Sequence, residues 1–561
     1  MIEKAHLRQA LATLRSYKQG KANLEQRLIA NEQWYKLRHW DYLRGNSGAQ
    51  QVEPVSAWLF NCIANKHADA MDNFPAPVML PREEGDRREA KLLSSVVPVI
   101  LDQSEFEQVY SEAWDDKLRS GTAIYGVFWE PEAGDGCGEI RVRHIDPIHL
   151  FWQPGVGHIK DSPNLFHVEL QDRQGLLERY PHLRDKLPTD TCEVSRYIYD
   201  DTVDTTDMVP VIDWYYHKGG KLHYCKFLGE ELLYASENDP NCAQRGWYDH
   251  GQYPFIFDPL FRVKGSPCGF GFIDVAKSAQ EYIDRCNQAI LKNMLANATP
   301  RHFIRGDGAV NEEEYLDLTR PLIHVDGQMG KDSILPVQGN PLSSIYVHIL
   351  NNKIDELKET TGNRDISAGG KTSGVTAASA IAALQEAGSK LSRDANKGTY
   401  RAFRRVVLLI IELIRQFYDA PRWFRIVGEG GAVEFAQYSN EKLRPQPREE
   451  VFGVELGRRV PLFDIEVTAQ KASPYAKMSQ NELALQFYVQ GFFEPNRAEQ
   501  ALLCLEMMDF ERKSFVMEAI SQNAQKHSQL QAMEQAMTVK LPGEATETRN
   551  ARRQTAEATA P

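Results

Sequence analysis

The stretch GFGFIDVAKSAQEYIDRCNQAILKNMLANATP, residues 269–300, decides the fold, because the spacing of apolar residues changes where it begins. Before it, short runs alternate between apolar and polar residues, whereas within it apolar residues recur every three or four positions. These positions are Phe272, Val275, Ala279, Tyr282, Cys286, Ile290 and Met294. A period of this length predicts one helix of about 30 residues, roughly 45 Å long, which Pro300 ends.

The chain before this helix combines helices with strands. The helical segments predicted by an apolar period of three to four are residues 4–43, 56–74 and 89–121. Alternating polarity then predicts a hairpin followed by a further strand at residues 121–154. More strands are expected at residues 209–236, with a bend at Gly219–Gly220. We therefore expect an α+β body before residue 260.

The chain after this helix is predicted to pass through a small turn-rich segment and then to become mainly helical. In chain order, the expected elements are strands at residues 301–304 and 321–325, a helix at 345–362, a long helical pattern at 375–418, strands near 422–428 and 462–470, helices at 477–540 and a disordered tail at 541–561. Gly388 and Gly398 interrupt the long helical pattern. Because glycine costs about 1 kcal/mol relative to alanine inside a helix, we expect bends there.

The composition is that of an ordinary globular protein. The 561 residues exceed what one core usually serves, so several subdomains are expected. Lysine and arginine number 65 and aspartate and glutamate 77, and the resulting net charge of −12 argues against a broad basic surface that grips nucleic-acid phosphates. The eight cysteines include no C-x-x-C pair, and no apolar run is long enough to span a membrane. We expect a soluble protein in a reducing compartment.

The sequence GGKTS, residues 369–373, resembles the end of a phosphate-binding loop. Such a loop has a glycine five residues before the glycine of its GK(S/T), because backbone N–H groups along the whole arc converge on the phosphates, and it joins a strand to a helix. Here Asp365 occupies the glycine position, and the preceding residues 345–362 have the period of a helix. We therefore predict a flexible connection between helices, no nucleotide site and no enzymatic activity.

Three other motifs contain chemically versatile residues, and each favours a structural role. In HIDPIH, residues 144–149, the two histidines fall on opposite faces of a strand, and Asp-Pro commonly opens a turn. NEEEYLD, residues 311–317, is a run of carboxylates of the kind that usually faces solvent. Trp214, Tyr215 and Tyr216 lie in a predicted strand and are expected in the core or in an interface. No metal site or cofactor is predicted.

The order of the expected elements resembles the portal proteins of tailed bacteriophages, and the resemblance covers most of residues 30–530. GEIRVRHIDPIHLFWQP, residues 138–154, is similar to the strand, Asp-Pro turn and aromatic strand of that family. Residues 248–290 resemble the passage into its first stem helix. The residues that carry this second likeness are Tyr253, Pro254, Gly265, Gly269, Gly271 and Gln280.

The resemblance implies a subunit with a mixed α/β wing, a long helical stem, a small β-containing clip and a helical crown. The implied boundaries are 1–265 for the first part of the wing, 266–300 for the first stem helix, 301–344 for the clip, 345–362 for the second stem helix, 363–374 for the tunnel loop, 375–475 for the long helix and second part of the wing, 476–540 for the crown and 541–561 for the disordered tail.

The resemblance also implies a function. Members of the family form a ring, typically of twelve subunits, at one capsid vertex, through which double-stranded DNA is packaged and ejected. The expected partners are the terminase large subunit, the major capsid and scaffolding proteins, a tail adaptor and transiently bound DNA, with no cofactor and no membrane. The protein is expected in the virion and, during assembly, in the host cytoplasm.

Two sets of residues are assigned roles by the resemblance. The tunnel-loop residues expected to face the DNA are Asn363, Arg364, Asp365, Lys371, Thr372 and Ser373. The clip residues expected to dock a packaging motor or tail adaptors are Glu312, Glu313, Glu314 and Asp317. The alternative interpretations are another structural or scaffold-type virion protein and, less favoured, a nucleotide-hydrolysing enzyme.

Overall fold

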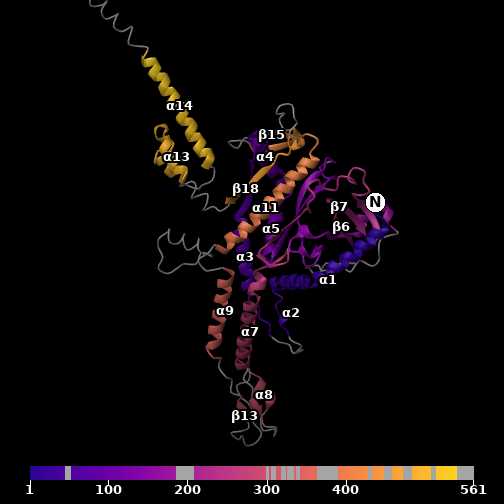
Figure 1. The fold of residues 1–561 in the computed structure, drawn as a ribbon. Coiled ribbons are helices and arrows are strands. Elements are labelled where there is room, and N and C mark those ends of the chain that lie inside the picture. The colour runs from indigo at the N-terminus through magenta and orange to yellow at the C-terminus, as the bar shows by residue number, and fades with distance from the viewer. Residues whose placement is uncertain are drawn as a thin grey trace, which may run out of the picture. The chain divides into compact units, whose positions relative to one another are not determined.

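The structure is a computed structural model with a mixed helical and stranded architecture (Figure 1), which confirms the predicted α+β class. The residues described are 1–44, 52–134, 136–184, 207–298, 302–304, 311–317, 324, 334–336, 342–362, 390–427, 433–447, 458–471, 483–506 and 513–539. The chain forms two compact units, Met1–Gln470 and Lys471–Pro561.

The first unit opens with helices, as predicted, but the first helix is shorter than its apolar period suggests. α1 spans Lys4–Tyr35 and α2 spans Trp40–Leu43. Between them Leu37 adopts a left-handed backbone conformation with a φ of 62°, which a right-handed helix does not accommodate. The helical segment predicted at residues 4–43 therefore consists of two helices with a break between them.

Three further helices confirm the other N-terminal predictions. α3 (Trp58–Met71) corresponds to the period at residues 56–74, and the period at 89–121 contains both α4 (Arg87–Gln103) and α5 (Phe106–Arg119). α3 and α5 pack against each other, and α5 also covers the first strands of the sheet that follows it.

Two antiparallel sheets follow, which contain strands in the predicted regions 121–154 and 209–236 and two further strands, at residues 164–172 and 255–259, that were not predicted from the sequence. The three-stranded sheet has the order β3-β2-β9, formed by Glu139–His144, Thr122–Glu130 and Phe255–Pro259. The five-stranded sheet has the order β4-β5-β6-β7-β8, formed by Leu150–Trp152, Asn164–Asp172, Met208–Lys218, Lys221–Leu228 and Glu231–Ala235. The predicted hairpin bend at Gly219–Gly220 is confirmed, because Lys218 pairs with Lys221 across it.

The HIDPIH turn and the aromatic triplet have the structural roles predicted for them. Asp146 caps the turn by accepting a hydrogen bond from the Ile148 backbone N–H at 2.8 Å. Tyr215 and Tyr216 are buried, and the Trp214 ring stacks at 4.2 Å from the Tyr216 ring beside the core of the five-stranded sheet.

Long helices dominate the later part of the first unit. α7 spans Phe272–Ala298, α9 spans Ile345–Thr361 and α11 spans Lys390–Phe417. The helices predicted at 269–300 and 345–362 are thus confirmed. α11 continues as one helix through Gly398, so this glycine does not interrupt it, and the bend expected there stays a prediction. The part of the long pattern that contains Gly388 lies outside the described residues.

The remaining elements are short ribbons, two short helices of the first unit and the helices of the second unit. They are β1 (Asn73–Pro81) paired with β18 (Phe463–Lys471), β10 (Phe261–Arg262) with β11 (Gly269–Phe270), β12 (His302–Ile304) with β13 (Ile334–Pro336), β14 (Arg422–Val427) with β15 (Val433–Tyr438), β16 (Gln446–Pro447) with β17 (Arg458–Arg459), and the helices α6 (Arg173–Arg179), α8 (Glu312–Leu316), α13 (Ala498–Glu506) and α14 (Lys513–Val539). In the second unit Phe487, Ala498, Leu505 and Ile520 form a separate small core.

A buried lysine joins α1 to the strands. Lys21 Nζ donates to the carbonyl oxygens of Pro147, Ile148 and Leu150 at 2.5, 2.9 and 2.8 Å. Glu25 lies 3.8 Å away as its counter-charge. Burial lowers the pKa of Lys21 from 10.5 to about 8. The ammonium group therefore acts as a structural clamp across segments that are far apart in the sequence.

Replacing this clamp tests its contribution. Lys21→Met removes the ammonium donor from three buried carbonyls and should destabilise the first unit by roughly 2 kcal/mol, measured by thermal or urea unfolding. Lys18→Met, the same substitution one turn earlier, is the matched control and should have little effect. Equal stability of the two variants would contradict the clamp.

The stability difference between the parent protein and Lys21→Met is also expected to depend on pH. Because the folded pKa of Lys21 lies near 8 and the unfolded one near 10.5, the unfolded chain holds more protons between these values. This lysine therefore makes the free energy of unfolding increase as pH rises from 8 to 10. The stability difference between the parent and Lys21→Met should widen over that range, whereas a constant difference would contradict the assigned pKa.

Candidate functional site: a helical pair anchored by a buried carboxylate

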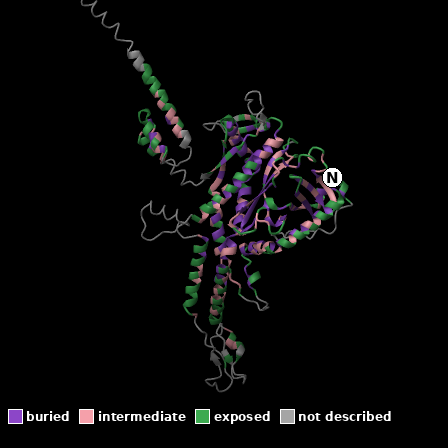
Figure 2. Ribbon diagram, in the orientation of Figure 1, coloured by how far each residue is buried: buried purple, intermediate pink, exposed green. Residues whose placement is uncertain are grey.

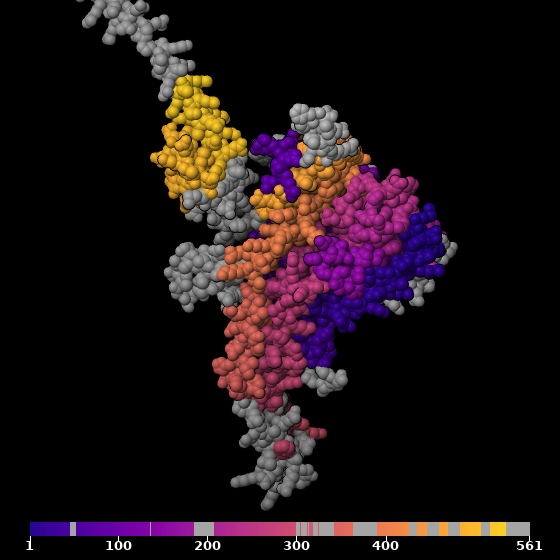
Figure 3. All heavy atoms as spheres, in the orientation of Figure 1, coloured from indigo at the N-terminus to yellow at the C-terminus, as the bar shows by residue number. Residues whose placement is uncertain are grey.

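The helices α7 and α9 form the first candidate site, and they pack side by side (Figure 1 and Figure 3). Each is buried only near the end that meets the rest of the first unit, here called the body. In α7 the buried residues stop at Asp284, and in α9 they are Leu357 and Thr361. The other halves of both helices, here called the distal halves, are largely exposed (Figure 2).

A buried polar network holds α7 against the body. Asp284 Oδ2 lies 2.6 Å from His39 Nδ1, and Asp284 Oδ1 accepts from the Ser56 backbone N–H at 3.1 Å. Gln280, one turn earlier, donates to Asp284 Oδ1 at 3.1 Å and to the Ser56 carbonyl at 2.7 Å. It also accepts from the Leu59 N–H at 3.1 Å. A buried carboxylate is stable only when it is paired and hydrogen-bonded, so these contacts fix the position of α7.

Both ring nitrogens of His39 have polar partners. Its Nδ1 faces the Asp284 carboxylate, and its Nε2 lies 3.0 Å from the Trp34 carbonyl oxygen. The ring is therefore held at both nitrogens between α7 and the end of α1. The ring also stacks on Trp34, with centroids 4.5 Å apart. His39, Gln280 and Asp284 are fully buried.

The helical pair carries an unusual amount of exposed apolar surface. Seven large apolar side chains on it are between 40% and 57% exposed: Tyr282, Met294, Leu295, Ile345, Tyr346, Val347 and Ile349. These residues are called the exposed apolar surface below. Helices of a soluble monomer usually turn such residues toward their own core, so a surface of this kind marks an interaction site.

The segment between the two helices is described at a few points. β12 and β13 pair antiparallel, and Asn311 caps α8 by accepting from the Glu314 backbone N–H at 3.3 Å. Among the predicted docking carboxylates, Glu313 is exposed, whereas Glu314 is mostly covered because it accepts from the His324 backbone N–H at 2.7 Å. Asp317 is half-buried. The docking role of these residues and of Glu312 stays a prediction.

The predicted tunnel-loop residues lie outside the described residues. They are Asn363, Arg364, Asp365, Lys371, Thr372 and Ser373. α9 ends before them at Gly362, whose φ of 67° is the left-handed conformation in which glycine commonly terminates a helix.

Sequence reasoning missed the anchoring network. Its one local signal is the pair Gln280 and Asp284, which are polar, one turn apart and on the face of α7 that also carries Ile283. A predicted helix with two such residues among its apolar positions indicates a buried polar contact. Its partners His39 and Ser56 have no signal in sequence, because they lie more than 200 residues away along the chain.

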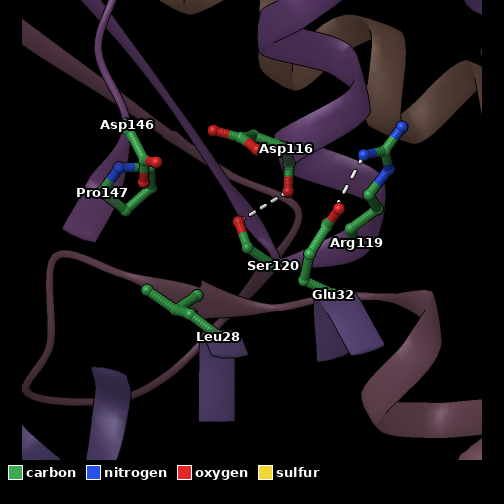
Figure 4. Close-up of a pocket in the computed structure, with 7 residues that line it drawn as sticks. All are labelled: Leu28, Glu32, Asp116, Arg119, Ser120, Asp146 and Pro147. Atoms are coloured by element: carbon green, nitrogen blue, oxygen red, sulfur yellow. Dashed lines mark hydrogen bonds and ion pairs between the residues drawn. The ribbon is translucent and has the colours of Figure 1, made fainter. Parts of the chain in front are cut away.

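A small cavity at the end of α5 provides no room for a substrate (Figure 4). Its volume is about 10 Å³, enough for one water at most. Asp116, which lines it, has its pKa raised to about 6 by burial and lies 2.8 Å from His144. The Ser120 hydroxyl donates to the Asp116 backbone carbonyl at 2.6 Å and not to that histidine. Acid, imidazole and hydroxyl therefore do not form a nucleophilic triad here. The other lining residues are Leu28, Glu32, Arg119, Asp146 and Pro147.

Comparison with protein families decides between the interpretations. Residues 68–561 match the model of the phage P22-like portal proteins. The chain belongs to this family. It is thus a bacteriophage virion protein of the head-tail connector, and the resemblance seen in the sequence is confirmed. No curated protein sequence matches the chain significantly. Within the described residues, no helix of this portal protein is long and apolar enough to cross a membrane.

The anchor makes a prediction about stability. Asp284→Ala leaves His39, Gln280 and the Ser56 N–H buried without their acceptor, so the first unit should lose roughly 3–5 kcal/mol. Glu281→Ala is the matched control, because Glu281 lies about one turn before Asp284 and pairs with Arg285 at the surface of the same helix. In thermal unfolding, the control variant should have nearly the same stability as the parent protein. A difference below about 1 kcal/mol between the two variants would refute the anchoring role.

Proposed function

We propose that this portal protein assembles into a ring at one capsid vertex and that double-stranded DNA passes through the ring during packaging and ejection. The observation that carries the proposal, beside family membership, is the exposed apolar surface of α7 and α9. Burial of this surface requires other protein, and adjacent copies of the same chain supply it in a closed ring.

The apolar residues at the start of α9 favour contact with other subunits on more than one side of the helix. Ile345, Tyr346, Val347 and Ile349 follow one another at about 100° per residue around the helix axis, so they point in several directions. α7 covers one face of α9. A helix that is apolar on several faces is stable when other elements surround it. A subunit in a ring has a neighbour on each side, which meets this requirement.

The same proposal assigns the elements of the chain to the parts of a portal subunit. The body and α11 form the wing, α7 and α9 the stem, β12, α8 and β13 part of the clip, and α13 and α14 the crown. Twelve copies are proposed from the usual number in portal rings. The terminase large subunit and a tail adaptor dock at the clip, and the major capsid and scaffolding proteins surround the ring during assembly. The ring needs no cofactor and no catalytic activity of its own.

Ring assembly is tested by substituting a charged residue into the exposed apolar surface. Val347→Asp should prevent rings while leaving the subunit folded, because the charge would be buried between subunits but is exposed in the monomer. Asn352→Asp adds the same charge to an exposed site of α9 whose side chain leaves the helix about 140° from Val347, and it should still form rings. Mass photometry and negative-stain microscopy measure the assembly, and circular dichroism checks the fold. Rings formed equally well by both variants would contradict the proposed subunit contact.

The channel role is tested at residues 363–374. Replacing them by a short Gly/Ser linker should preserve the ring, since loop-closure entropy changes slowly with length, but should impair packaging or retention of DNA. Arg364→Ala and Lys371→Ala should have milder effects, because each removes one phosphate contact among many. The measurement is packaging into empty capsids in vitro, with ring formation checked separately. Normal packaging by the linker variant would exclude the channel role.

A further inference from the structure

A cleft of about 510 Å³ lies between α11 and the strands β9 and β10. Its walls combine apolar surface from Phe257 and Phe261 with charged side chains from both sides. Arg401 and Arg405 approach from α11, and Arg262 approaches from β10. A recess of this size takes up one or two side chains of another molecule.

The floor of the cleft is already satisfied within the chain. Lys117 Nζ donates to Asp258 Oδ2 at 2.7 Å, to Thr399 Oγ1 at 2.6 Å and to the Ala395 carbonyl at 3.2 Å. Lys117 and Asp258 are both buried, and burial lowers the pKa of Lys117. With its three donors in use, Lys117 supports the floor but offers no contact to a ligand.

The arginines at the rim, in contrast to Lys117, make few contacts within the described part of the chain. Within the described residues, Arg262 and Arg405 have no hydrogen-bond or ion-pair partner, and Arg401 donates to the Lys397 carbonyl of its own helix at 3.3 Å. Although Arg405 is solvent-exposed, the cleft walls partly desolvate its guanidinium and lower its pKa. Among the described residues that line the cleft, Asp394 is the carboxylate at the rim that opposes these three charges. The cleft is therefore locally basic in a chain whose net charge is −12.

The chemistry of the cleft suits a protein carboxylate better than a DNA backbone. Arginine forks bind carboxylates through two parallel hydrogen bonds, and the phenyl rings can pack against the methylene groups of an acidic side chain. A duplex is convex and uniformly negative, so it would meet the fixed charges of Asp258 and Asp394 and could not enter a recess. Arginine and aromatic side chains at a recess are also the composition of strongly contributing positions in protein interfaces.

We propose that this cleft receives an acidic side chain from the neighbouring copy of the chain. The inference rests on the proposed ring, and two observations favour a second copy as the occupant. The chain has twelve more acidic than basic residues to offer. In addition, α11 adjoins the helical pair that carries the exposed apolar surface, since Gly362 at the end of α9 lies against Leu391 (Figure 3).

Carbodiimide cross-linking of assembled rings tests the contact directly. Arg405→Lys keeps the charge and adds a primary amine, which forms an amide with an adjacent activated carboxylate. Rings assembled from a mixture of ¹⁴N- and ¹⁵N-labelled subunits are cross-linked, digested and analysed by mass spectrometry. We expect the introduced lysine to be joined to an aspartate or glutamate peptide in mixed-isotope pairs. Arg8→Lys is the control, because Arg8 pairs with Glu230 of its own chain and should give single-isotope adducts.

A second measurement concerns ring strength. Arg401→Ala combined with Arg405→Ala should raise the concentration at which half of the rings dissociate by about tenfold or more, and Arg425→Ala, an exposed arginine on β14, should not. If the parent protein forms no rings, the proposed function fails. If parent rings form but the Arg405→Lys variant yields no mixed-isotope adducts and the double variant dissociates like the parent, the cleft proposal is overturned. Rings of unchanged strength with weakened DNA binding would also overturn it, in favour of a duplex contact.

Discussion

The carboxylate of Asp284 is the constraint on which the exposed helical pair depends. Removing a charge from water is costly, and the cost is offset only in a geometry where every oxygen has a partner. Here Oδ2 faces His39 and Oδ1 accepts from Ser56 and Gln280. A shift of α7 by one residue along its axis would break the contacts with His39 and Ser56, whereas an apolar contact tolerates such sliding. The network therefore sets the register of α7 against the body.

The register of α7 in turn positions α9. The end of α9 is fastened by apolar burial of Leu357 and by Thr361, whose hydroxyl donates to the Leu357 carbonyl at 2.8 Å and lies 3.4 Å from Cys62 Sγ on α3. The two helices thus use different means at their two ends. Polar, directional contacts fix α7 to the body, burial of Leu357 and Thr361 fixes α9, and exposed apolar surface remains available on both helices. This arrangement suits a subunit that must fold alone and then pack against copies of itself.

The sequence predicted those elements whose pattern is local and long. α7 and α9 repeat an apolar period over several turns, and the Gly219–Gly220 bend marks its hairpin. β1 escaped prediction because its nine residues include three prolines, which argue against a strand, and it is stabilised by pairing with the distant β18. Gly398 did not interrupt α11, because the buried Ala402, Phe403 and Val406 hold that helix in the core and outweigh the local cost of glycine.

The candidate site was less predictable than the fold for a related reason. The exposed apolar surface is visible in sequence as apolar residues, but sequence alone does not show which of them the subunit leaves uncovered. The anchor combines residues from three separate segments, of which α7 alone had a recognisable pattern. Local periodicity reports how a segment folds, whereas these features depend on which segments meet.

The buried polar contacts also extend the structural unit beyond the family match. The match begins at residue 68, yet Lys21 holds the carbonyls of residues 147–150, and His39 and Ser56 supply the partners of Asp284. Without residues 1–67, the Asp284 carboxylate would lose its contacts with His39 and Ser56 and three buried carbonyls would lose the Lys21 ammonium, at a cost comparable to the whole stability of a typical domain. The N-terminal helices are therefore part of the body in physical terms. Their sequence is constrained at a few buried polar positions and elsewhere by apolar periodicity alone.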